Sequence, residues 1–221
     1  MHKTVVIICD GRFPKSDYPR YLISNADHVI CCDGALQKFI RNSEAIFGEK
    51  KLPDVVVGDM DSLPQSLRKR HSDIIVQIDE QEHNDQTKAF RWAIENIKDI
   101  SQIYILGATG EREDHTIGNI SLLMEYARMY DLEGMGINVE MVSDHATIFA
   151  VTDTFEMDCG EGRRISIFSP DNSLRICSEG LEWPTDDVVF DNWWKATLNR
   201  ASQDHIKLTF SHRSIALIMM N

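Results

Sequence analysis

Two aspartates that follow a strand-like run are the residues of this chain best suited to chemistry. Residues 55–62 read VVVGDMDS, a β-branched run and then a glycine that allows a tight turn. Asp59 and Asp61 are two residues apart, so in extended backbone their side chains point the same way. Two like charges this close repel each other unless a cation lies between them, and oxygen ligands on a loop suit Mg²⁺. The alternative is a solvated turn in which Ser62 caps the next helix.

A second cluster lies at residues 107–115, which read GATGEREDH and follow another strand-like run. Its glycines, Gly107 and Gly110, permit close backbone approach, and the N–H groups at the start of the next helix attract anions. Arg112 offers a planar fork of donors to phosphate oxygens. Asp114 is interpreted either as a helix N-cap or as a ligand contact, and His115 either as a ligand contact or as a helix-start residue.

Polar residues also follow the remaining strand-like runs of the N-terminal part. They are Asp10-Gly11, Asp33-Gly34 and residues 82–88, which read EHNDQTK. Ligands of α/β proteins bind at the carboxyl ends of the strands, which is where these clusters are expected to lie. Neither a P-loop nor a Gly-x-Gly-x-x-Gly segment is present, so the common nucleotide motifs do not apply.

The elements that must position these clusters alternate between strands and helices. We expect strands at 4–9, 28–32, 54–57, 74–78 and 102–106, and helices at 21–26, 35–42, 63–71, 85–96 and 116–130. Pro64 is expected in the first turn of its helix, behind Ser62. Such alternation predicts a parallel sheet with helices on both faces.

Beyond residue 139 the pattern changes to short strands separated by turn signals. We expect them at 139–143, 147–152, 164–169, 174–177, 206–211 and 214–219. The sequence therefore predicts an α/β fold, with a Rossmann-like three-layer domain of parallel sheet over residues 1–140 and an antiparallel β-sandwich over residues 141–221. The strand at 139–143 is assigned either to the first sheet or to the sandwich.

Composition excludes several classes of partner. The 221 residues are 43% hydrophobic and 26% charged, with a net charge of −12, so neither nucleic acid nor an anionic membrane surface is expected as partner. The cysteines are odd in number, at five, and form no Cys-x-x-Cys pair, which favours free thiols in a reducing cytoplasm. No apolar run approaches the length of a membrane span.

Taken together, the clusters resemble the thiamin pyrophosphokinase family. The resemblance rests on the order and spacing of Asp33-Gly34, Gly58-Asp59-Met60-Asp61-Ser62, Asp85-x-Thr87 and Gly107-Ala108-x-Gly110-x-Arg112-x-Asp114-His115-x3-Asn119. It continues in Arg164-Ile165-Ser166-Ile167 and Gly180-Leu181-Glu182-Trp183-Pro184. Each motif alone is weak, but the set in this order is specific and covers most of the chain.

The resemblance implies a homodimeric enzyme, with its site between subunits, that transfers a pyrophosphoryl group from ATP to the hydroxyl of thiamin. The products would be thiamin diphosphate and AMP. The resemblance implies Mg²⁺ on Asp59, Asp61 and Asp85, which with Arg112 would be the catalytic residues. It assigns nucleotide contacts to Asp33, Gly34, Gly58, Thr87, Lys88, Gly107, Gly110, Arg112 and His115. It assigns thiamin contacts to Asp114, Asn119, Ser166 and Trp183.

Two positions depart from the family pattern. Lys88 stands where a second aspartate usually completes Asp-x-Thr-Asp, and Glu111 stands where a Gly-Gly pair usually precedes the arginine. Either Lys88 contacts a phosphate directly, or Glu82 or Glu113 replaces the missing carboxylate, or catalysis is weakened. The Ser-Asn segment of the family is matched only loosely, by Leu198-Asn199.

Other functions remain open at this stage. One is a Mg²⁺-dependent phosphotransferase that acts on another alcohol, and another is a non-catalytic homologue that binds thiamin or a nucleotide. An aspartyl-phosphate phosphatase is disfavoured, because Asp10-Gly11-Arg12 does not supply the nucleophilic Asp-x-Asp that such enzymes need. Trp193 and Trp194 are interpreted as a dimer contact, as a lid over the substrate or as part of the sandwich core.

Overall fold

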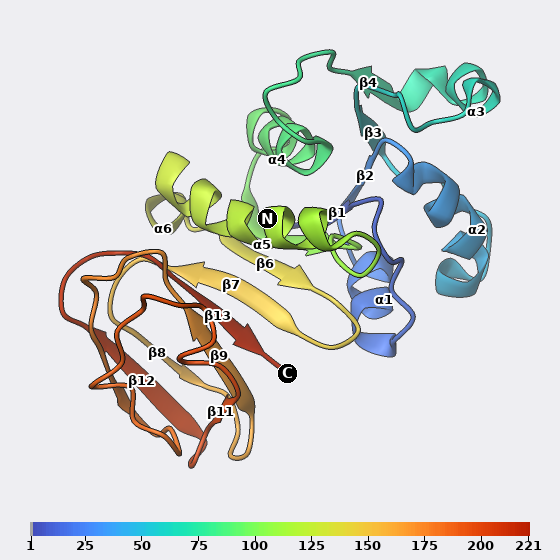
Figure 1. Cartoon of the computed structure of the whole chain (residues 1–221). Coiled ribbons are helices and arrows are strands. Elements are labelled where there is room, and N and C mark those ends of the chain that lie inside the picture. Colours follow the sequence, from blue (N-terminus) through green and yellow to red (C-terminus); the bar gives the residue numbers. More distant parts are fainter. Residues whose placement is uncertain (1) are drawn as a thin grey trace. The chain divides into compact units, whose positions relative to one another are not determined.

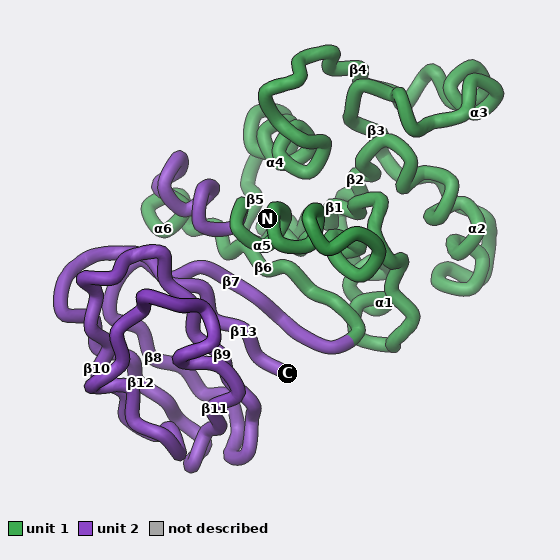
Figure 2. The backbone as a smooth tube through the Cα atoms, viewed as in Figure 1, with its two compact units in different colours: residues 1–122, 132–144 green, residues 123–131, 145–221 purple. Residues whose placement is uncertain are grey.

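The computed structural model describes residues 2–221 and divides into two compact units (Figure 2). The first comprises the chain up to Leu122 together with Leu132–Asp144, and the second comprises Leu123–Asp131 together with His145–Asn221. Each unit has its own sheet architecture, so the two are described separately.

The first unit is built on a parallel sheet with the strand order β4-β3-β2-β1-β5-β6 (Figure 1). Every neighbouring pair in this order runs parallel. The strands are β1 (Lys3–Ile8), β2 (His28–Cys32), β3 (Val55–Gly58), β4 (Ile75–Gln77), β5 (Ile100–Leu106) and β6 (Asn138–Val142). Because all of them point the same way, their carboxyl ends lie at one edge of the sheet, where the polar clusters follow.

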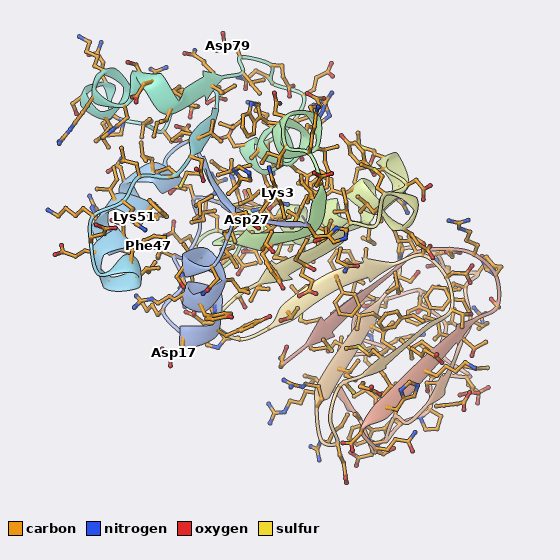
Figure 3. All side chains as sticks on the ribbon, turned by 180° about the vertical axis from the view of Figure 1, so that it is seen from behind. Lys3, Asp17, Asp27, Phe47, Lys51 and Asp79 are labelled. Carbon is orange, nitrogen blue, oxygen red and sulfur yellow. The ribbon has the colours of Figure 1, made fainter. Side chains whose placement is uncertain are left out.

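Helices connect these strands. They are α1 (Asp17–Ser24), α2 (Ala35–Phe47), α3 (Gln65–Arg70), the 3₁₀ turn η1 (Ser72–Ile74), α4 (Asp85–Asn96), α5 (Glu113–Met129) and α6 (Leu132–Met135). At the end of α2 the chain turns through Gly48, whose φ is +74°, and Lys51 Nζ lies 4.8 Å from the centre of the Phe47 ring (Figure 3). A left-handed glycine is the usual way to end a helix.

The parallel sheet is covered on both faces. Val6 and Ile8 of β1 share a core cluster with side chains of α1 and α2. Val5 and Ile7 alternate with them, so they point to the opposite face, and they are fully buried as well. The helix α4 contacts β1, β2 and β3, and its Phe90 is fully buried. This is the three-layer arrangement predicted from the alternating sequence pattern.

The second unit is built from short antiparallel strands. Its strands pair in two antiparallel sets, in the orders β7-β13-β9-β11 and β10-β12-β8, which belong to different sheets. The strands are β7 (Thr147–Val151), β8 (Phe155–Asp158), β9 (Arg164–Phe168), β10 (Ile176–Glu179), β11 (Asn199–Arg200), β12 (His205–Phe210) and β13 (Ala216–Met220). Buried residues from both sheets, among them Ile167 and Leu208, share one apolar core, as expected for a sandwich.

The predicted fold class is confirmed, and the corrections are local. Strand β6 pairs with β5, which settles the alternative left open for 139–143 in favour of the parallel sheet. Strands β8 and β11 were not predicted. The helix α3 begins after Pro64 rather than around it, because Pro64 has an extended ψ of 137° and the side chain of Leu63 is buried in the core. Within residues 2–221, no helix is long and apolar enough to cross a membrane.

Candidate active site

The loop after β3 holds two carboxylates on either side of a buried anchor. Met60 has a positive φ of 68° and no exposed surface, and its side chain belongs to the core under α2. Asp59 and Asp61 flank it, and Asp59 Oδ1 accepts a hydrogen bond of 3.1 Å from Asp61 N. The buried methionine therefore fixes the loop and directs both carboxylates outward from the strand end.

Asp33 brings a third carboxylate to the same place. It follows β2, which pairs with β3, and its side chain is 1% exposed. Single carboxylate oxygens of Asp33, Asp59 and Asp61 all lie within 4.8 Å of one another. Asp33 Oδ2 accepts a 3.0 Å hydrogen bond from Ser62 N, whereas Asp33 Oδ1 is buried and accepts none from residues 2–221. A buried oxygen without a donor beside two further carboxylates is what a bound divalent cation would satisfy.

Position 58 requires a glycine because the side chains of Asp33 and Asp85 lie close to its backbone. A Cβ there would lie 2.9 Å from Asp33 Cβ and 3.0 Å from Asp85 Oδ1. The first distance is shorter than real Cβ contacts and the second is tighter than most of them, so a larger residue would displace the two aspartates. Gly58 thus lets the ends of β2, β3 and α4 converge on one acidic cluster, formed by Asp33, Asp59, Asp61 and Asp85.

Lys88 places an ammonium within this acidic cluster. Its side chain is 2% exposed, and Nζ lies 3.3 Å from Asp85 Oδ1 and 3.4 Å from Asp59 Oδ2. Burial lowers the pKa of Lys88, but the charges of Asp85 and Asp59 outweigh it and raise the pKa overall. Lys88 is therefore charged at neutral pH.

The pKa values of the aspartates show how crowded the cluster is. Burial raises the pKa of Asp33 to about 6, the Ser62 N–H opposes this, and the charges of Asp85, Asp61 and Asp59 add to it. Burial also raises the pKa of Asp85, although Lys88 partly offsets it. Burial acts the same way on Asp59, but the Asp61 N–H and the ammonium of Lys88 prevail and lower its pKa. The ionised cluster is thus short of positive charge.

The glycine-rich loop after β5 lies against the loop after β1. Gly107 has a φ of +64°, and a Cβ there would lie 2.7 Å from Cys9 O. Gly11 N donates to Gly107 O at 2.7 Å. Lys38 of α2 joins the same place, where Nζ lies 3.0 Å from Asp10 Oδ1 and 3.0 Å from Glu111 Oε1. Glu111, which departs from the family pattern, therefore pairs with a lysine that the sequence did not single out.

Arg112, Asp114 and His115 pair with one another at the start of α5. The Arg112 fork donates to both oxygens of Asp114, at 3.2 and 2.7 Å, and these side chains are about two-thirds exposed. Asp114 Oδ1 also accepts from His115 N at 2.8 Å and lies 3.0 Å from His115 Nδ1. Hydrogen bonds from Arg112 and His115 lower the pKa of Asp114 strongly. The three side chains are accessible to a ligand.

The predicted N-cap role of Asp114 is wrong, because α5 begins at Glu113 and Asp114 lies in its first turn. The helix starts early since Arg112 O already accepts a 2.9 Å hydrogen bond from Thr116 N. Asn119 lies further along α5 and is 8% exposed. Its Nδ2 donates to Ala108 O and its Oδ1 accepts from Asn84 Nδ2, each at 2.8 Å. In this structure Asn119 ties the glycine-rich loop to the start of α4.

Thr87, another predicted nucleotide contact, is 2% exposed in the first turn of α4, and its N–H donates to the side chain of the N-cap, Asn84, at 3.0 Å. Gly34 follows Asp33, and a Cβ there would lie 2.4 Å from Asp10 Oδ2. Both residues therefore lie beside the acidic cluster, in positions where little space is free.

Two domain models of one known family match this chain. The family described as thiamin pyrophosphokinase, catalytic domain, matches residues 19–133, and its substrate-binding domain matches residues 147–216. The chain belongs to the thiamin pyrophosphokinase family. This confirms the predicted resemblance and the prediction that the chain is an enzyme of the thiamine diphosphokinase type.

Individual relatives are distant but cover most of the chain. Thiamine pyrophosphokinase 1 of Oryza sativa subsp. japonica is 26% identical in an alignment of 229 positions that covers 92% of this chain and 82% of the relative. Thiamine pyrophosphokinase of Bacillus subtilis is 29% identical in an alignment of 144 positions that covers 62% of this chain and 63% of the relative. A crystal structure of the Bacillus subtilis enzyme matches with a TM-score of 0.75 at 19% identity, covering 99% of both chains. The enzyme from Candida albicans also gives 0.75, at 16% identity, over 99% of this chain and 88% of that one.

In the second unit of this family member, residues 198–199 form hydrogen bonds with two of the predicted thiamin contacts, Ser166 and Trp183. Ser166 Oγ on β9 accepts a 3.0 Å hydrogen bond from Leu198 N. The side chain of Asn199 donates to Trp183 O at 2.6 Å and accepts from Trp183 N at 3.2 Å. The Trp183 ring is 52% exposed. The loosely matched segment 198–199 therefore holds Trp183 beside β9 with its ring accessible.

Trp193 and Trp194 are 54% and 68% exposed, which excludes the interpretation that they fill the sandwich core. Trp193 packs edge-on against Phe168, with 6.4 Å between ring centres. Each ring keeps a large apolar surface open to solvent, a common property of residues that contact ligands or partners.

The carboxylates that the structure groups together differ from the predicted set of metal ligands. Asp33, predicted as a nucleotide contact, groups with Asp59 and Asp61, whereas Asp85 faces Lys88. Among residues 2–221, the carboxylates grouped closely enough for a metal do not include Glu82 or Glu113, which were considered as replacements for the missing aspartate. The sequence signals for Asp33 were its place directly after a strand and its match to the Asp33-Gly34 motif of the family resemblance, and neither signal indicated a metal ligand.

Proposed function

We propose that this protein transfers a pyrophosphoryl group from ATP to the hydroxyl of thiamin in a Mg²⁺-dependent reaction, giving thiamin diphosphate and AMP. The observation that carries the proposal is the acidic cluster at the carboxyl edge of a parallel sheet. The exposed Arg112 follows β5, another strand of the same sheet. Matches to both the catalytic and the substrate-binding domains of the family support the choice of substrates.

The residues of the cluster fit a divalent cation. Asp33, Asp59 and Asp61 would hold the ion, with Asp85 completing the predicted set from the neighbouring helix. Bound Mg²⁺ would supply a Lewis acid that neutralises charge on the phosphate oxygens. Asp33 Oδ1 and Asp85 Oδ1, which are buried and accept no hydrogen bond from residues 2–221, would gain a partner in such an ion.

The chain itself must position the reactants. Arg112 can release Asp114 and turn its fork to phosphate oxygens, because both side chains are exposed. His115 and the glycines of the 107–110 loop are proposed to contact the nucleotide, and Asp114 the thiamin. A carboxylate of the cluster, Asp61 or Asp85, accepts the proton that the thiamin hydroxyl loses as it attacks the β-phosphorus.

Trp183 and Ser166 are proposed to contact the thiamin rings. An exposed indole face attracts a flat or cationic ring, which describes both halves of thiamin. We also propose a homodimer with the site completed by the second subunit, supported by the exposed rings of Trp183, Trp193 and Trp194. The free cysteines, at positions 9, 31, 32, 159 and 177, support a cytoplasmic location.

The proposal is tested by incubating the purified protein with ATP, Mg²⁺ and thiamin and separating the products by chromatography. Thiamin diphosphate and AMP in equal amounts are expected. ADP with thiamin monophosphate would show a single phosphoryl transfer and refute the mechanism. Absence of product, with thiamin still bound, would identify a binding protein. Size-exclusion chromatography with light scattering tests the dimer, which a monomer at the assay concentration would contradict.

A further inference from the structure

Lys88 occupies the position of a cation rather than that of an ordinary surface lysine. Its ammonium lies between two carboxylates on different elements, Asp59 after β3 and Asp85 at the start of α4. The two distances, 3.4 and 3.3 Å, are nearly equal and longer than a close hydrogen bond. The ammonium donates a hydrogen bond to Asp59 Oδ2 and lies within ion-pair distance of Asp85 Oδ1, so its charge is shared between the two carboxylates.

The burial of Lys88 requires this arrangement. A charged ammonium is strongly destabilised inside a protein unless opposite charges surround it, and this side chain is only 2% exposed. Lys88 lies three residues after Asp85, the first residue of α4, so the helix itself holds the ammonium beside this carboxylate. The position is therefore built into the fold and does not depend on a bound ligand.

The acidic cluster has two sides with different partners. On one side Asp33, Asp59 and Asp61 present oxygens close enough together for a metal, and Asp33 Oδ1 is buried without a donor from residues 2–221. On the other side the ammonium of Lys88 lies within ion-pair distance of Asp59 and Asp85, although Asp85 Oδ1 accepts no hydrogen bond from residues 2–221. Asp59 belongs to both sides, which is the arrangement of a carboxylate that bridges two cations.

We propose that the ammonium of Lys88 is a tethered cation that takes the place of a second divalent ion between Asp59 and Asp85. The protein therefore binds one divalent ion, at Asp33, Asp59 and Asp61, where a cluster without the lysine would bind two. The inference rests on the metal site of the proposed function and adds the number of ions. It makes Lys88 a positioning residue that acts through the two carboxylates.

The test counts bound metal in the nucleotide-free protein, so that it does not depend on activity. Mn²⁺ is titrated into the protein, and free Mn²⁺ is measured by electron paramagnetic resonance, with isothermal titration calorimetry as a second count. Wild-type protein should bind one ion. Lys88→Met keeps the length of the side chain but removes its charge, and it should bind two. Lys88→Arg keeps the charge and should bind one.

Lys38→Met is a matched control. Lys38 also lies between two carboxylates, Asp10 and Glu111, but outside the acidic cluster, so its removal should leave the count at one. Thermal melting in EDTA gives an independent readout. The melting temperature of Lys88→Met should fall below that of wild type in EDTA and rise more steeply with added Mn²⁺, because the ion replaces the lost charge.

The metal counts show whether the inference alone is wrong or the metal site is wrong as well. Two ions in wild type, or one in a folded Lys88→Met protein, would overturn the inference while leaving the metal site intact. No ion in wild type at millimolar Mn²⁺ would contradict the metal site and the inference together. If Lys88→Met does not fold, as judged by circular dichroism, Lys88→Gln removes the same charge and is counted in its place, and it should also bind two ions.

Discussion

Replacing Asp33 by asparagine should stabilise the metal-free protein at neutral pH while it weakens metal binding. Asp33 is 1% exposed, and its pKa rises from 3.8 to about 6 on folding. Each pKa unit corresponds to about 1.4 kcal/mol, so ionised Asp33 lowers the stability of the metal-free fold by roughly 3 kcal/mol, as an upper bound. Burial is the main cause, and repulsion from the neighbouring aspartates adds to it.

Asparagine suits the position. Its carbonyl oxygen can keep the hydrogen bond from Ser62 N, and its amide can then point where Asp33 Oδ1 now lies without a donor. The neutral amide also removes the repulsion from Asp59, Asp61 and Asp85. The expected gain is therefore about 2–3 kcal/mol in the free energy of unfolding at pH 7.5 in EDTA.

The pH dependence has a definite sign. A carboxyl with a raised pKa binds more protons when folded, so its destabilising effect is absent below about pH 4. The effect grows as the pH rises through the window from 3.8 to about 6, and it is complete above that window. The advantage of Asp33→Asn over wild type should follow the same curve and fall to about half at pH 5.

The assay is urea unfolding in EDTA, followed by circular dichroism at pH 5 and pH 7.5 for both proteins. Asp79→Asn is the matched control, because Asp79 is exposed on the loop after β4 and outside the acidic cluster (Figure 3). It should change stability by less than about 0.5 kcal/mol. A loss of stability in Asp33→Asn at pH 7.5, or a gain that does not shrink at pH 5, would refute the electrostatic reasoning.

Three further predictions concern the neighbouring residues. Asp61→Asn should reduce turnover of thiamin at least 100-fold, because it removes a charged oxygen from the cluster, and full turnover would contradict the metal assignment. Arg112→Ala should raise the KM for ATP about tenfold or more with little change in melting temperature, since the side chain is exposed; an unchanged KM would remove Arg112 from the phosphate site. Asn119→Ala should lower the free energy of unfolding by roughly 1–3 kcal/mol, measured in urea, because it leaves Ala108 O and the Asn84 amide without their buried partner. A stability equal to that of wild type would show that water replaces it.

Elements whose signals are local were predicted from the sequence alone. Strand β2 and helix α4 were predicted with the bounds that the structure has, His28–Cys32 and Asp85–Asn96. A continuous apolar run defines the first, and helical spacing of apolar residues defines the second. The alternation of such elements was enough to predict a parallel sheet and to place the polar clusters at its carboxyl edge.

Elements that depend on partners distant in the sequence were missed or misplaced. Strand β11 is only two residues long and exists because it pairs with β9, more than thirty residues earlier. Strand β8 reads FEMD, without a run of β-branched residues, and is held by its pairing with β12. Such strands are stabilised by the ladder they join rather than by their own composition.

The residues of the candidate site also differ in whether the local sequence or only the tertiary structure reveals them. Residue types and spacing were sufficient to select Asp59, Asp61 and Arg112, because carboxylates two residues apart after a strand, and an arginine before a helix, imply their chemistry locally. Only the tertiary structure placed Asp33 with the first two and set the ammonium of Lys88 between Asp59 and Asp85. Those relations depend on which strand ends lie side by side and on how closely Gly58 lets them approach. The order of residues along the chain does not determine these distances, because they arise from packing between segments far apart in the sequence.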